Sequence, residues 1–201
     1  MDMFKIFRNI VFFQELSDEE INILISISTP RLLLKKEKLL EPGQSLNDLF
    51  ILSSGLLRFY FDDEDGVESN LFLPSEKEAT IMESPESYSD NHERQYTIEA
   101  VIESQIFLFN KAEFEEIAFQ HRGIYNMYLK SFKQIIGILK LRTEQFCSTS
   151  PHSRYEEFLE ARPFTSQNAN RKYIANFLGI TPNSLSRMTA RIHKKRNERK
   201  K

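Results

Sequence analysis

The sequence has little of the residues that cross-link or sharply turn a chain. Of 201 residues, only Cys147 is cysteine, six are glycine and none is tryptophan. A single cysteine excludes an internal disulfide and agrees with a reducing cytoplasm. No stretch approaches the roughly 18 apolar residues of a membrane span. The N-terminal MDMFKIFRNIVFFQEL lacks a small-residue cleavage site, so we expect a helix there and not a signal peptide.

Catalytic motifs are also missing, which argues against an enzyme. We find no Gly-rich phosphate loop, no nucleophile elbow and no Cys/His pairing. The histidines form no H-x-H pattern, so a cupin-like metalloenzyme, the enzymatic alternative for a β-rich body, lacks its ligands and no metal site is expected. The four histidines are His92, His121, His152 and His193.

The charge is divided unevenly along the chain. Residues 171–201 contain ten basic residues and one acid, a net charge of 10 − 1 = +9. The other 17 basic and 28 acidic residues give residues 1–170 a net charge of 17 − 28 = −11. An acidic body with a basic end predicts a polyanion partner for that end, with a merely solvated tail as the alternative.

The basic end begins with the pattern of two short helices joined by a tight turn. Apolar residues before Gly179 are spaced three and four apart, as on one helix face. Gly179 can take a positive φ and end that helix, and Thr181 and Pro182 favour the start of the next. The second helix is expected from Pro182 to about Lys194. This order predicts a DNA-binding helix-turn-helix.

The outward side of the second helix carries side chains that suit DNA. We expect base contacts from Asn183, Ser184 and Arg187, because Asn pairs with adenine and Arg with guanine in the major groove. An αα-hairpin packed on a body would share the spacing, but it explains neither the polar face nor the local charge. The residues expected at DNA phosphates are Lys172, Thr181, Arg191 and Lys194.

Residues 31–110 contain short apolar runs that are separated by turn residues. Asp65-Gly66 is a hairpin signal between two such runs. Several short strands with regular turns predict an antiparallel barrel or roll. Within the run LLRFYF, Arg58 and Tyr60 alternate with Leu57 and Phe59, so one face can line an interior while the other meets a neighbour.

A short helix over Lys111–Phe119 and a long helix over about 123–146 are expected to follow the strands. The long helix carries apolar residues spaced three and four apart, which predicts a coiled-coil dimer seam. A core helix lying on the roll is the alternative. The predicted seam is Tyr125, Tyr128, Phe132, Ile135, Leu139, Arg142 and Phe146.

A further helix is expected from Pro151 to Glu160, followed by a polar link over residues 163–170. We place the domain boundary near residues 147–152. The expected domains are therefore a sensor roll with its long helix, 1–147, and a helix-turn-helix domain with a basic tail, 148–201. Only the polar link, which is short, remains for the wing strands that often flank such a motif.

This order of elements resembles the Crp/Fnr family of transcription regulators. The resemblance is carried by LLEPGQSLNDLFILSSGLLRFYFDDEDG (39–66), by the long helix and by KYIANFLGITPNSLSRM (172–188). It implies an α+β fold, with an N-terminal antiparallel, cyclic-nucleotide-binding-like β-roll and a C-terminal all-α helix-turn-helix domain. It also implies a cytoplasmic homodimer that binds double-stranded DNA, with RNA polymerase as a further candidate partner.

The resemblance implies an effector pocket whose cyclic AMP signature is degenerate here. Family members hold the cyclic phosphate with a Gly-Glu turn, an Arg and a following Ser or Thr. Glu83, Arg94 and Gln95 stand near those positions, but LPSEKEATIMESPES contains no glycine and Gln95 replaces the hydroxyl residue. Cyclic AMP is therefore not expected, and another small effector or none stays open.

The cofactors of other family sensors also lack their ligands. Cys147 cannot hold an iron–sulfur cluster alone, and His92 and His121 are isolated as haem ligands. No cofactor is expected. An interaction module of the same fold that no longer binds DNA is the remaining alternative.

Overall fold

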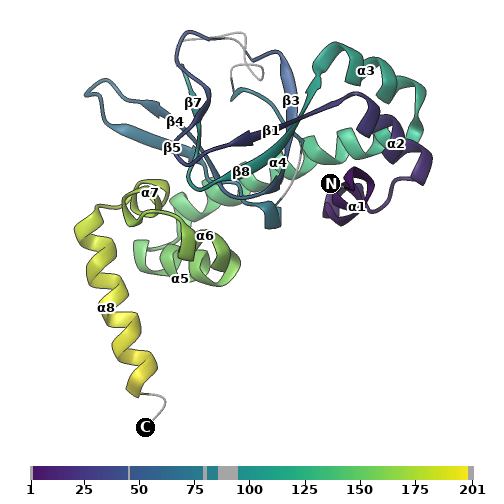
Figure 1. Ribbon diagram of the computed structural model, residues 1–201. Coiled ribbons are helices and arrows are strands. Elements are labelled where there is room, and N and C mark those ends of the chain that lie inside the picture. The colour runs from purple at the N-terminus through teal and green to yellow at the C-terminus, as the bar shows by residue number, and fades with distance from the viewer. Residues whose placement is uncertain (1, 45, 79–80, 86–94, 199–201) are drawn as a thin grey trace.

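The computed structural model describes residues 2–44, 46–78, 81–85 and 95–198, without the side chains of 193–198. Within the described residues, three helices precede the first strand and six follow the last (Figure 1). The N-terminal helices are α1 (Met3–Asn9), the 3-10 helix η1 (Val11–Phe13) and α2 (Asp18–Ser26). The later ones are α3 (Lys111–Gln120), α4 (Arg122–Ser148), α5 (Pro151–Ala161), α6 (Pro163–Asn168), α7 (Arg171–Phe177) and α8 (Pro182–Glu198).

The strands form two antiparallel four-stranded sheets, which confirms the expected roll. One sheet has the order β1-β8-β3-β6 and the other β2-β7-β4-β5. The first sheet consists of β1 (Ser28–Leu33), β3 (Asp48–Ser54), β6 (Ile81–Met82) and β8 (Ser104–Asn110). The second consists of β2 (Lys38–Leu40), β4 (Leu57–Asp62), β5 (Glu68–Phe72) and β7 (Thr97–Ala100). A second 3-10 helix, η2, spans Glu76–Glu78.

Strand β3 shows why the sequence of the roll consists of short, continuous apolar runs. Successive side chains of a strand point to opposite faces, and both faces of β3 are covered. Leu49 and Ile51 pack against the N-terminal helices, α3 and α4, whereas Phe50 and Leu52 fill the space between the sheets. All four are fully buried, and burial of each such side chain contributes about 1.5–3 kcal/mol.

Gly55 permits the turn between β3 and β4. Its φ is +107°, a region that favours glycine. A Cβ there would lie 2.2 Å from Oγ of Ser104. The Ser104 hydroxyl accepts a hydrogen bond from the amide of Leu56 at 3.1 Å. This close approach joins the β3–β4 turn to the start of β8.

Helix α4 crosses from the roll to the C-terminal helices (Figure 1). Its first turns are buried against the roll through Ile124, Met127 and Ser131. Helices α5, α7 and α8 share a separate core around Phe158, Ile174 and Leu185. Ser150 caps α5 by accepting from the Ser153 amide at 3.1 Å, with Pro151 at its first position.

Two segments differ from the sequence-based expectation. The apolar N-terminal stretch is not one helix, because α1 ends at Asn9 and a 3-10 turn follows, with Phe7 and Phe13 fully buried. The polar link after Pro163 is helix α6, not an extended segment. Pro163 suits the first helical position, and Thr165 in α6 is fully buried.

Candidate nucleic-acid interface

Helices α7 and α8 form the expected pair around a small apolar core. Ala175 is fully buried, and its small side chain lets the helices approach closely. Leu185, Met188 and Ile192 of α8 are buried at helical spacing. The hydroxyls of Tyr155 on α5 and Thr189 on α8 lie 3.0 Å apart and tie the pair to α5. One side of α8 is therefore buried against the protein, and the opposite side is exposed to solvent.

The turn between the helices has the chemistry that its sequence predicts. Gly179 has a φ of +67°, and a Cβ there would lie 2.7 Å from Cε1 of Phe146. The hydroxyl of Thr181 caps α8 by accepting from the Ser184 amide at 3.2 Å. The turn thus sets the angle at which α8 leaves α7.

The predicted base-contacting residues lie together on the free side of α8. Asn183 and Arg187 are exposed, and Ser184 is half-buried. Arg187 donates to the Ser184 hydroxyl at 3.4 Å. Figure 1 shows α8 projecting away from the rest of the molecule, with its N-terminal end beside α7. This amide and guanidinium are accessible to a groove that admits a helix.

The predicted phosphate-contacting residues flank this side. Thr181, Lys172 and Arg191 are exposed. Lys172 at the start of α7 lies 3.8 Å from a Glu68 carboxylate oxygen of β5. The side chain of Lys194 lies outside the described residues. Sequence reasoning found the polar face but missed the contact of α7 with the roll.

That contact covers the edge strand of the second sheet. Strand β5 is last in its sheet, so one side of its backbone lacks a strand partner. The Asn70 amide donates to Oδ1 of Asn176 at 2.5 Å, and the Asn176 side chain donates to the Glu68 carbonyl. The Asn70 side chain donates to the Tyr173 carbonyl at 3.1 Å. Helix α7 therefore continues the hydrogen bonding of the sheet.

A buried guanidinium lies under the same contact. Arg58 of β4 is 3% exposed and forms ion pairs with Glu68 at 2.8 Å and Glu99 at 3.0 Å. Its Cζ lies 3.7 Å from the Tyr60 ring centroid and 4.1 Å from that of Tyr173. The sequence predicted that the face of β4 carrying Arg58 and Tyr60 would meet a neighbour. In the structure, Arg58 on this face contacts Tyr173 of α7.

Burial and the neighbouring charges shift the pKa values of side chains in this cluster. Burial would lower the pKa of Arg58, but hydrogen bonds and the charges of Glu68 and Glu99 outweigh burial and raise it. The hydrogen bond from Arg58 lowers the pKa of Glu68, against the opposing effect of burial. Burial raises the pKa of Tyr173. Arg58 and Glu68 are therefore charged and paired at neutral pH.

The predicted dimer seam on α4 needs correction. Tyr128 is buried against the roll, and Ile135 lines an internal cavity. Arg142 donates to carbonyls of Leu71, Asn70 and Phe177, the last two at 2.9 and 3.1 Å. These three side chains face their own chain, because the roll and α7 pack on that side of α4.

The exposed apolar stripe of α4 shares four residues with the predicted seam and differs from it at two positions, each displaced by one residue, or about 100° around the helix. Tyr125, Leu139 and Phe146 of the prediction remain exposed, and Phe132 is half-buried. Leu129 and Ile136 replace Tyr128 and Ile135, with exposed fractions of 39% and 64%. The stripe consists of Tyr125, Leu129, Phe132, Ile136, Leu139 and Phe146.

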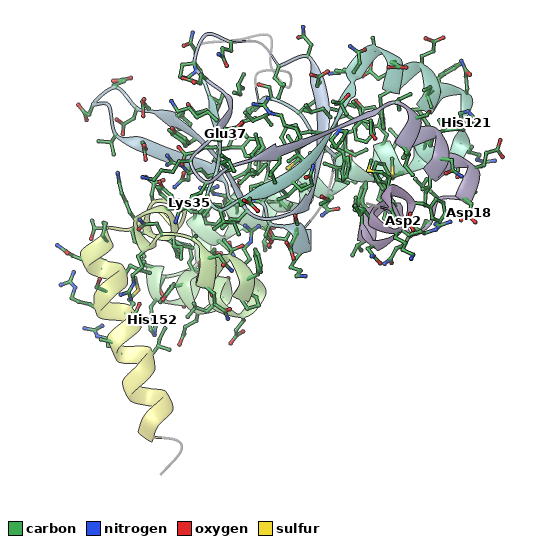
Figure 2. All side chains as sticks on the ribbon, viewed as in Figure 1. Asp2, Asp18, Lys35, Glu37, His121 and His152 are labelled. Atoms are coloured by element: carbon green, nitrogen blue, oxygen red, sulfur yellow. The ribbon has the colours of Figure 1, made fainter. Side chains whose placement is uncertain are left out.

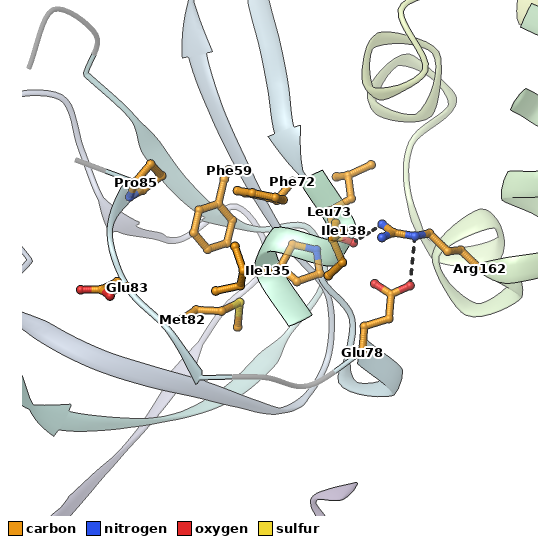
Figure 3. Close-up of a pocket in the computed structure, with 11 residues that line it drawn as sticks. Phe59, Phe72, Leu73, Glu78, Met82, Glu83, Pro85, Ile135, Ile138 and Arg162 are labelled. Carbon is orange, nitrogen blue, oxygen red and sulfur yellow. Dashed lines mark hydrogen bonds and ion pairs between the residues drawn. The ribbon is translucent and has the colours of Figure 1, made fainter. Parts of the chain in front are cut away.

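Of the predicted effector residues, the two that the structure describes, Glu83 and Gln95, do not form a nucleotide site together. Glu83 is buried, and its carboxylate pairs with Lys111 of α3 at 2.6 Å. This pairing argues against the predicted role of Glu83 as the carboxylate of an effector site. Figure 3 shows Glu83 turned away from the apolar side chains around the cavity. Gln95 is exposed before β7. Arg94 lies outside the described residues.

A small apolar cavity does lie between the roll and α4. Its volume is about 50 Å³, room for a few water molecules. Phe59, Phe72 and Met82 line one side and Ile135 of α4 the other (Figure 3). At its rim Arg162 donates to Glu78 at 3.1 Å, and burial raises the pKa of Glu78.

The structure describes the side chains of two histidines, His121 and His152. Figure 2 shows His121 and His152 at distant places in the molecule. No group of three His, Cys, Asp or Glu side chains is placed to hold a metal ion within the residues that the structure describes. Among these same residues, no helix is both long and apolar enough to cross a bilayer.

Comparisons with known proteins identify the roll and the overall fold. The family model of the cyclic nucleotide-binding domain matches residues 30–121. Solved structures of Crp/Fnr regulators match over most of the chain. The protein has the Crp/Fnr regulator fold.

Three of these structures illustrate the extent of the match. FixK2 from Bradyrhizobium japonicum is 15% identical with a TM-score of 0.63, covering 84% of this chain and 86% of its own. A CooA mutant from Carboxydothermus hydrogenoformans is 17% identical with a TM-score of 0.65, and the match covers 86% of this chain and 79% of the CooA chain. The c-di-GMP-responsive regulator CLP from Xanthomonas campestris is 12% identical at 0.66, with 89% and 93% coverage. The comparison with curated protein sequences found no match.

Proposed function

We propose that this Crp/Fnr-like protein is a dimeric transcription regulator that reads DNA sequence with α8. The observation that carries the proposal is the exposed pair of Asn183 and Arg187 on a helix whose opposite side is buried. Amide and guanidinium groups recognise adenine and guanine edges in the major groove. The excess of basic residues in 171–201 supports binding to a polyanion.

The exposed stripe of α4 supports the dimer. Ile136 and Tyr125 are 64% and 44% exposed, and a contiguous apolar surface of this kind on a regulator favours a partner helix. Spacing of four and three residues along the stripe is that of a coiled-coil seam. Two α8 helices related by a two-fold axis would read half-sites about one helical turn apart, so we expect a near-palindromic operator.

The described part of the roll argues against cyclic AMP as the effector and leaves another small effector, or none, open. Glu83 is engaged by Lys111, and the cavity beneath α4 is small and lined mainly by apolar side chains. A cyclic phosphate needs a cation and backbone amides in the pocket. We therefore expect no calorimetric signal from cyclic AMP. A signal that Glu83→Gln abolishes would contradict this assignment.

Selection of binding sequences from a random duplex pool tests the DNA-binding proposal. The wild-type protein should enrich a near-palindromic motif. Arg187→Ala should lose about 1–3 kcal/mol of specific binding and relax one base position per half-site. Lys172→Ala should weaken cognate and random duplexes alike and reduce the salt dependence. Failure to enrich any motif, or an unchanged cognate-to-random ratio in Arg187→Ala, would refute base reading by α8.

A further inference from the structure

A second cleft lies where α4, α5, α7 and the end of β5 meet. It has a volume of about 120 Å³, which exceeds the space needed for several water molecules. Its walls come from Phe72 and Ile138 on the roll side and from Phe158 and Phe177 on the C-terminal side. We call it the junction cleft. Any occupant would touch both the roll with its long helix and the helix-turn-helix domain.

Three arginines line the junction cleft: Arg142 on α4, Arg154 on α5 and Arg162 at the start of α6. Only Arg162 has a carboxylate partner, Glu78, within ion-pair distance among the residues that the structure describes. Arg142 instead donates to backbone carbonyls, and so does Arg154, to Thr149 at 2.7 Å. Two guanidinium charges at the cleft are thus hydrogen-bonded but not neutralised.

Arg154 also has a donor without an acceptor. The residue is 9% exposed, and its Nε atom is buried with no hydrogen-bond partner in the described part of the chain. A buried donor left unsatisfied is destabilising, and a buried charge needs a counter-charge. A ligand in the cleft that supplies an anionic oxygen would provide this counter-charge.

The arginines also repel one another. Burial, and after it the charge of Arg162, lowers the pKa of Arg142 to about 10. Glu157 lines the same cleft, but its carboxylate accepts from the Gln145 side chain at 2.7 Å. Phe177 lies under Arg142, with 4.2 Å between Cζ and the ring centroid. The cleft therefore combines excess positive charge with apolar walls.

We propose that the junction cleft binds a small organic anion, a carboxylate or phosphate on an apolar body. Its oxygens would be held by Arg142 and Arg154, as charge-assisted hydrogen bonds. Its apolar part would lie against Phe72 and Ile138, which also line the apolar cavity beneath α4. The ligand would bridge the two domains at the edge strand β5.

Isothermal titration calorimetry of the full chain with sodium hexanoate tests this site. Hexanamide has the same length without the charge, and its titration is run at matched sodium chloride. We expect hexanoate to bind about tenfold more tightly than hexanamide or better. Arg142→Gln and Arg154→Gln should each remove that preference. Arg31→Gln, on β1 and outside the cleft lining, should retain it.

Arg142 and Arg154 also donate to backbone carbonyls, so their substitution could disturb the fold. A second measurement therefore uses the wild-type protein alone. In heteronuclear NMR spectra of the wild-type protein, hexanoate should shift the Arg154 Nε–H signal and the Leu178 amide, and hexanamide should not. Absence of hexanoate binding, equal binding of both probes, or an unmoved Arg154 signal would each overturn the proposal. Neither measurement involves DNA, so the result is independent of whether α8 reads base sequence.

Discussion

Arg58 shows how a single buried side chain connects the roll to α7. It belongs to β4, yet its guanidinium lies against Tyr173 of α7 and pairs with Glu68 of β5. Removing one partner of a buried pair leaves an uncompensated charge, which is more destabilising than the pair is stabilising. The cluster thus favours one arrangement of α7 against the roll.

Glu68 gives this cluster a pH dependence with a definite sign. Its hydrogen bond from Arg58 lowers its folded pKa below the ordinary value of 4.5. The contribution is fully present above pH 4.5 and is lost as pH falls through the lower, folded value. Glu68→Gln should therefore reduce the loss of stability on acidification. Urea unfolding at a series of pH values from neutral to acid measures this.

The matched control is Glu116→Gln, an exposed carboxylate on α3. Its unfolding free energy should keep the wild-type slope against pH. If Glu68→Gln followed the same slope as Glu116→Gln and the wild type, the pairing with Arg58 would contribute nothing to folding. Surface screening keeps the expected difference modest, since 31% of the Glu68 side chain is exposed.

At the scale of elements, the docking of α7 on β5 rests on side-chain amides. Asn176 accepts from the Asn70 amide and donates to the Glu68 carbonyl. Asn176→Ala leaves a part-buried backbone N–H without a partner, which should cost about 1–3 kcal/mol. Urea denaturation measures the loss. Exchange of the Asn70 amide hydrogen should also accelerate, since its acceptor is gone.

Asn168→Ala is the matched control for this docking. Asn168 also donates one side-chain bond to a backbone carbonyl, that of Phe164, but it is exposed at the end of α6. Its loss should stay within about 0.5 kcal/mol. Equal effects of the two variants, or an unchanged exchange rate at Asn70, would mean that α7 is held by its apolar contacts alone.

The elements that sequence predicted well are those fixed by local chemistry. Gly179, Thr181 and Pro182 set the turn and the start of α8 through φ, capping and ring geometry, which depend on near neighbours. The alternating faces of β4 likewise followed from a period of two. Local rules did not reveal α6, because only the burial of Thr165 by the surrounding helices distinguishes it from a polar link.

The face of α4 could not be assigned from its sequence for a related reason. The apolar residues of this helix are spread over several of its faces, so more than one possible dimer seam fits the three- and four-residue spacing. Arg142 was placed in the dimer seam, whereas its acceptors, Leu71 and Phe177, lie 71 and 35 residues away along the chain. Only the packed molecule shows which side of α4 the roll occupies.

On the scale of the whole molecule, the exposed stripe of α4 predicts how two chains associate. Ile136 is its most exposed aliphatic residue at 64% and lies midway along α4. Ile136→Glu would bring two carboxylates into an apolar seam, where unpaired charges are strongly disfavoured. We expect this variant to sediment as a folded monomer, with a circular dichroism spectrum like that of the wild type.

Leu141→Glu is the control, because Leu141 is similarly exposed at 56% but lies about 140° away from Ile136 around the helix. It should remain a dimer. A palindromic site requires both α8 helices, so Ile136→Glu should also lose about as much specific affinity as one half-site supplies, while Leu141→Glu keeps it. If Leu141→Glu dissociated the dimer and Ile136→Glu did not, the partner would lie on another side of α4. The two α8 helices would then be presented with a different spacing.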